Sequence, residues 1–161
     1  MNHRKLSDIH SILLNHWDWE VKGQKPTIDN WLSLYKSFPE FHYSGPAFRA
    51  LLAKELKKLP ISGDSQYFRS FSKSMEGVGE YLNGRHIDCE IETDDRVIIV
   101  RAEIVGVDVQ KISAALIDAG FSGHEAEGFR REEEVIAVEI GEWDHHEMTP
   151  DEIWQGNSKK G

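Results

Sequence analysis

The spacing of hydrophobic residues changes near residue 41, and this change constrains the fold more than any other feature. Before it, apolar residues recur every three or four positions over residues 6–14 and again over residues 28–35, which is typical of one face of a helix. After it, continuous or alternating apolar runs at 97–100 and 132–140 indicate strands. Helices followed mainly by strands predict an α+β domain with a mixed or antiparallel core.

Capping residues divide the second part of the chain into elements. Ser74 can accept from backbone amides of the following turn and predicts a helix ending near Gly84, and Asp108 does the same for a helix ending at Gly120. The aromatic-rich segment 67–72 predicts a strand.

Two further segments are assigned from their patterns alone. Residues 47–52 predict a strand that continues as a helix over 53–59, with a boundary that intrinsic propensity leaves open. Alternation over residues 87–93 predicts another strand, in which Cys89 is a small core residue.

The charge balance is acidic and limits the partners. The chain has 161 residues, of which 19 are Lys or Arg and 28 are Asp or Glu, so the formal net charge is −9. A domain that binds phosphates through its overall field normally has a basic excess, which argues against nucleic acid as a partner. The length predicts one domain. The residue patterns divide it into a helical part at 1–40, a core at 41–141 and an acidic aromatic tail at 142–161.

The sequence does not indicate a disulfide-stabilised, secreted, membrane-spanning or metal-binding protein. The lone Cys89 cannot form an internal disulfide, so nothing requires an oxidising compartment. Residues 1–17 resemble neither a signal peptide nor a membrane span, which favours a cytoplasmic protein without membrane contact, although no sorting feature decides against delivery into another cell. The adjacent His145 and His146 point oppositely on an extended chain and have no spaced partners, so no metal site is predicted.

Strand periodicity places candidate polar residues together. Side chains two apart on a strand share a face, so Ser70 and Ser72 point the same way, as do Glu132 and Glu134. Glu134 is in phase with the apolar Ile136. The two carboxylates are therefore expected to project into a cleft bordered by the end of the sheet.

Three motifs in this order resemble a known family. The segment 45–51, which contains Arg49, resembles the aromatic-Arg-Gly segment of the mono-ADP-ribosyltransferases of the arginine-serine-glutamate class. Residues 70–74 are similar to the family's Ser-Thr-Ser segment, and 132–136 to its Glu-x-Glu motif. The resemblance covers roughly residues 43–140, favours the small bacterial or phage-type members, and implies a mixed, mainly antiparallel two-sheet core of the ADP-ribosyltransferase type.

The resemblance also implies a reaction and its residues. The enzyme would transfer ADP-ribose from NAD, without a metal, to an arginine of a protein acceptor. Glu134 would stabilise the oxocarbenium-like ribose, and Glu132 would activate the acceptor guanidinium. Arg49 would hold the pyrophosphate, Ser70 would bind the ribose and place Glu134, and Ser72 would stiffen the cleft.

The remaining features of the resemblance include departures from the family. The loop 121–131 would face the acceptor, with Phe129 as a contact. Phe48, on the NAD side, replaces the family's usual Tyr, and Ala50 stands where Gly is usual. The triple acid also allows Glu133 to be a motif acid, although the aliphatic residues that follow favour Glu132 and Glu134.

A second class of function fits the same charge balance. An acidic interaction module without catalytic activity, binding a basic protein partner, is motivated by the net charge and by the acidic segments 125–134 and 139–152. A third reading keeps the transferase fold but changes the acceptor to a nucleic acid or a small molecule. Binding of NAD distinguishes the module from the enzyme.

Overall fold

Helices and strands both contribute to the fold, which confirms the α+β class. The computed structural model describes residues 3–22, 29–55, 69–121 and 130–160. Its α-helices are α1 (His3–Lys22), α2 (Asp29–Ser37), α3 (Met75–Ile87), α4 (Val109–Asp118) and α6 (Pro150–Lys160). Its strands are β1 (His42–Leu52), β2 (Arg69–Ser72), β3 (Val97–Asp108) and β4 (Glu134–Met148), with short 3-10 turns η1 (Pro39–Phe41) and η2 (Ala53–Glu55).

The strands form one closed sheet in the order β1-β2-β4-β3, and every pairing among the described strands is antiparallel. The prediction of two sheets is therefore wrong. The long pairings of β1 and β4 with β3 are closed by the short β2, which pairs with both β1 and β4. At an irregularity in β3, a Cβ on Gly106 would lie 2.0 Å from the carbonyl oxygen of Ile136, so a residue without a side chain lets the two strands approach.

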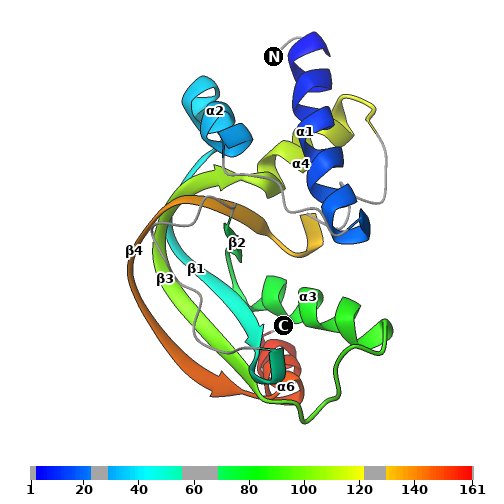
Figure 1. Cartoon of the computed structure of the whole chain (residues 1–161), viewed down its shortest axis with the longest axis vertical. Helices are drawn as coiled ribbons and strands as arrows, with labels where there is room; N and C mark the ends of the chain where they lie inside the picture. The colour runs from blue at the N-terminus through cyan, green and yellow to red at the C-terminus, as the bar shows by residue number, and fades with distance from the viewer. Residues whose placement is uncertain (1–2, 23–28, 56–68, 122–129, 161) are drawn as a thin grey trace.

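Two groups of helices cover opposite ends of the bowed strands (Figure 1). Helices α1, α2 and α4 pack around one cluster, which includes Ile9, Trp31 and Leu116. Helices α3 and α6 pack around another, which includes Leu82 and Ile153. A third cluster is formed by side chains from all four strands, with members Ala47, Phe71, Ala102, Ile104, Val135 and Ala137.

Both predicted N-caps are confirmed. The side chain of Ser74 accepts from the amide of Gly77 at 3.3 Å, and that of Asp108 accepts from the amide of Lys111 at 3.0 Å. Helix α4 ends just before Gly120, which has a φ of 91°. Helix α3, by contrast, continues past Gly84 to Ile87. These caps depend on local chemistry, which explains why the sequence alone locates them.

The strand predicted over residues 87–93 is wrong. Helix α3 ends at Ile87, and the residues that follow form a turn leading into β3. Cys89 is exposed there, with a φ of 60°, and is not a core residue. The alternating pattern was real, but Ile91 is its buried member whereas Ile87 is 70% exposed.

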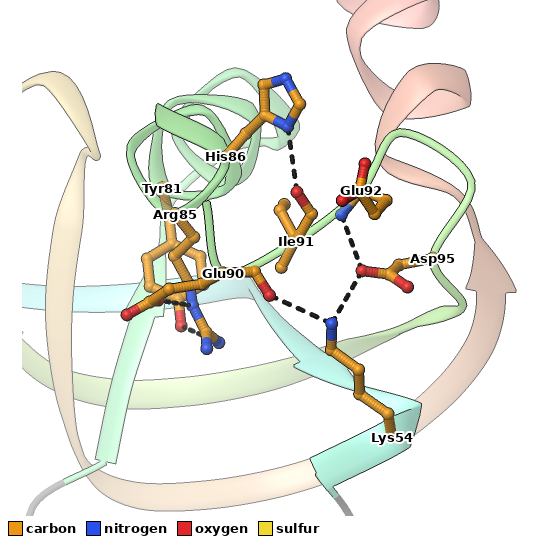
Figure 2. A network of polar contacts seen from close by, with 8 residues as sticks. All are labelled: Lys54, Tyr81, Arg85, His86, Glu90, Ile91, Glu92 and Asp95. Atoms are coloured by element: carbon orange, nitrogen blue, oxygen red, sulfur yellow. Dashed lines mark hydrogen bonds and ion pairs between the residues drawn. The ribbon is translucent and has the colours of Figure 1, made fainter. Parts of the chain in front are cut away.

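Polar contacts between distant segments hold this turn (Figure 2). The Lys54 ammonium donates to the carbonyl oxygen of Glu90 and to the carboxylate of Asp95, each at 3.0 Å. The same carboxylate accepts from the amide of Glu92 at 2.8 Å. The bond from Glu92 and, to a smaller extent, the bond from Lys54 lower the pKa of Asp95. Arg85 on α3 pairs with the Glu90 carboxylate at 2.6 Å. The turn η2, which follows β1, thus fixes the α3–β3 connection through Lys54.

The segment predicted as a tail, 142–161, is part of the fold. Strand β4 extends to Met148, and helix α6 then packs on α3. The Trp154 indole donates to the carbonyl oxygen of Gly79 at 3.0 Å, and the Asn157 amide donates to that of Met75 at 3.0 Å. Of the helix predicted over 53–59, only η2 falls within the described residues.

Candidate functional site

The sheet brings two of the predicted motifs face to face. In the antiparallel pairing of β2 with β4, Ser70 lies opposite Ile136 and Ser72 opposite Glu134. Ser72 also lies opposite Phe48 on β1. Opposed residues of an antiparallel pair project from the same face, so Ser70, Ser72, Phe48 and Glu134 share one face of the sheet.

A hydrogen bond joins the predicted serine and acid. The Ser70 hydroxyl donates to Oε1 of Glu134 at 2.7 Å, although 64 residues separate them in the chain. Glu134 is only 4% exposed, and Ser72 beside it is 8% exposed. A hydrogen bond to a carboxylate is short and directional, so Ser70 fixes the orientation of the Glu134 carboxylate.

Arg49 and Glu132 act on a common neighbour, Tyr81 of α3. Burial raises the pKa of the Tyr81 phenol, the positive charges of Arg85 and Arg49 lower it, and the negative charge of Glu132 raises it. The Arg85 guanidinium also donates to the Tyr81 hydroxyl at 3.3 Å. Electrostatic interactions weaken with distance, so Arg49 and Glu132 both lie in the neighbourhood of Tyr81.

The three consecutive acids have different environments. Glu134 begins β4 and meets Ser70, whereas the carboxylate of Glu133 accepts from the hydroxyl of Ser74. Glu132 is half-buried and precedes them in a turn. The acid in contact with Ser70 is therefore Glu134 and not Glu133, which agrees with the phase expected from the sequence.

A second polar cluster, which the sequence did not reveal, lies just after β2, next to Ser72. The Lys73 ammonium pairs with the Asp108 carboxylate at 3.0 Å, and both side chains are largely buried. Burial raises the pKa of Tyr43, and the charges of Asp108, Glu103 and Glu133 raise it further. The only sequence signal here was the N-cap role of Asp108, because the pairing with Lys73 depends on strand position.

The other predicted site residues are placed as follows. Phe48 is half-buried and packs against the cluster under α3 and α6. Phe129 lies outside the described residues. His145 and His146 are exposed on β4, and the described part of the chain contains no group of three or more His, Cys, Asp or Glu that could hold a metal.

Helix α3 approaches the acidic turn at Gly77. A Cβ at this position would lie 2.3 Å from the carbonyl oxygen of Glu132 and 3.0 Å from Cβ of Ser72. Gly77→Ala is therefore expected to force α3 away from β4 and to lower the free energy of unfolding by about 1–3 kcal/mol. A chemical denaturation curve measures the change.

Gly84→Ala is the matched control for this substitution. Gly84 lies in the same helix, and a Cβ there would meet nothing within 4 Å. Alanine is the better helix former by up to about 1 kcal/mol, so this variant is expected to be as stable as the wild type or more stable. Equal destabilisation by the two variants would contradict the close approach at Gly77.

No protein-family model, curated protein or solved structure matches the chain. None of the described helices combines the length and the apolar character that crossing a membrane requires.

Proposed function

We propose that the protein is a mono-ADP-ribosyltransferase that moves ADP-ribose from NAD to an arginine of a protein acceptor. The observation that carries the proposal is the hydrogen bond of Ser70 to the buried carboxylate of Glu134. Ser70 on β2 and Glu134 on β4 meet on one face of the closed sheet, which further supports the proposal, whereas Arg49 follows Phe48 on β1 and its side chain starts from the opposite face. With a single, exposed cysteine and hence no internal disulfide to maintain, we place its action in the cytoplasm.

The chemistry of the donor set suits NAD as a co-substrate. Cleavage of the nicotinamide–ribose bond develops positive charge on the ribose, and a carboxylate held in place stabilises that charge without reorganising. Ser70 holds Glu134 in one orientation for this purpose. Arg49 supplies a forked cation for the pyrophosphate, which an acidic protein needs if it is to bind an anionic substrate.

Glu132 is assigned the role of orienting and activating the acceptor arginine. It is half-buried beside α3 and lies two positions before Glu134. A guanidinium stays protonated in water, so a neighbouring carboxylate is the group that orients it and takes its proton during attack on the ribose. Glu132 would thus act in transfer, and Glu134 in cleavage of the glycosidic bond.

The test uses labelled NAD and an arginine-rich acceptor protein, with transferred label and released nicotinamide measured separately. We expect the wild type to label the acceptor and Glu132→Gln to lose label transfer by about 10²–10⁴-fold, the usual contribution of a general base. Its release of nicotinamide to water should fall far less. Absence of both activities in a folded wild type that also fails to bind NAD would refute the proposal and favour the acidic interaction module.

A further inference from the structure

The turn that precedes β4 is held from three neighbouring elements. The amide of Glu133 donates to the carbonyl oxygen of Arg130 at 3.2 Å, which closes the turn, and that oxygen also accepts from the side chain of Gln110 on α4 at 3.0 Å. The amide of Lys73, just after β2, donates to the carbonyl oxygen of Glu133 at 3.0 Å. The first turn of α3 approaches the carbonyl oxygen of Glu132 at Gly77.

Glu133 has an unusual backbone conformation. Its φ is 51°, in the left-handed region that residues with a Cβ rarely adopt. Such a conformation persists when the surrounding contacts determine it. Here the main chain of Glu133 is bonded at both its amide and its carbonyl, and its side chain accepts from the hydroxyl of Ser74.

The conformation of Glu133 decides where its two neighbours point. Glu132 and Glu134 are joined only through this residue, so a change in its φ rotates one carboxylate relative to the other. Glu134 is also held by β2 pairing and by Ser70. Glu132 precedes Glu133 in the turn, so the direction of Glu132 relative to β4 is set through the backbone of Glu133.

We infer that Glu133 is a positioning residue. Its carboxylate accepts a hydrogen bond from the Ser74 hydroxyl, called the latch below, and this bond fixes Glu132 relative to Glu134 for transfer to the acceptor. The Ser74 hydroxyl lies at the N-cap of α3, so the latch joins the helix that borders the site to the turn that carries both acids. This inference rests on the proposed function. It assigns Glu133 no contact with NAD or the acceptor.

The first experiment measures the latch without reference to activity. Ser74→Ala, Glu133→Ala and the double variant are compared by thermal unfolding. If the two side chains are coupled, the melting temperature of the double variant falls by less than the sum of the decreases in the two single variants. Strict additivity would overturn the latch. The loss of the N-cap in Ser74→Ala does not obscure the result, because it occurs in both backgrounds.

The second experiment measures label transfer and nicotinamide release in the same variants. Glu133→Ala is expected to reduce the ratio of transfer to release by about ten- to a hundredfold, as expected for a displacement of about 1 Å at a reacting group. Glu133→Gln retains an oxygen that accepts from Ser74 and should recover most of the ratio. The exposed Glu139 of β4 provides the control variant Glu139→Ala, which should leave the ratio of transfer to release unchanged.

The results separate the latch from the proposed function. An unchanged ratio in Glu133→Ala, in an enzyme whose wild type is active, would overturn the positioning role. A wild type without either activity would refute the proposed function and with it the positioning role, whereas coupled unfolding would still support the structural contact of Ser74 with Glu133.

Discussion

Glu134→Gln is expected to abolish most ADP-ribosyl transfer and nicotinamide release while the protein stays folded. Glutamine retains the shape and the oxygen that accepts from Ser70, but it removes the charge. Loss of one preorganised electrostatic group typically costs about 10²–10³-fold in rate. Because cleavage precedes transfer, both readouts should fall together, in contrast to the selective loss of transfer expected of Glu132→Gln.

The control for this variant is Glu139→Gln on the same strand. Glu139 is exposed, whereas Glu134 is buried at the start of β4. Glu139→Gln removes one negative charge, as Glu134→Gln does, so it tests whether the activity depends only on the acidic net charge of the protein. Similar activity of Glu134→Gln and wild type, with equal melting temperatures, would exclude Glu134 from the reaction.

Ile153→Ala is expected to cause the largest loss of stability that we predict. Ile153 of α6 is 1% exposed and packs with Val78 and Leu82 of α3. Removal of a buried isoleucine side chain costs about 2–5 kcal/mol, because the transfer energy is lost and a cavity remains. For a chain of this size, each kcal/mol lowers the melting temperature by about 2–4 °C.

Ile87→Ala removes the same atoms from an exposed position. Ile87 is 70% exposed at the end of α3, so its truncation should change the free energy of unfolding by less than about 0.5 kcal/mol. Calorimetry compares the two variants directly. Equal melting temperatures would show that α6 is not part of the core.

Local signals in the sequence located several elements well. The N-caps at Ser74 and Asp108 are made by side chains that bond to amides three residues away, so the information lies within one turn. The continuous apolar run at 97–100 lies in β3, with Val97, Ile99 and Val100 buried. The chain order of Arg49, Ser70 and Glu134 was likewise visible, but their chemistry stays a prediction.

Patterns failed where burial depends on distant partners. The alternation at 87–93 is typical of a strand, yet contacts from Lys54 hold this segment as a turn. The segment 142–161 is acidic and aromatic, and its pattern did not identify α3 as the element with which Ile153 completes a core. Hydrophobic periodicity measures only the amphipathic character of a segment, not the element that covers it.

The sequence by itself determined the α+β class, the starts of α3 and α4 and the spacing that allows Ser70 and Glu134 to share a face. Only the tertiary structure decided that one closed sheet forms, that Glu134 and not Glu133 meets Ser70, and that Ser74 holds Glu133. The physical reason is that caps and periodicity arise from neighbours in the chain. Strand register and side-chain pairing across 59 or 64 residues depend on which segments pack together.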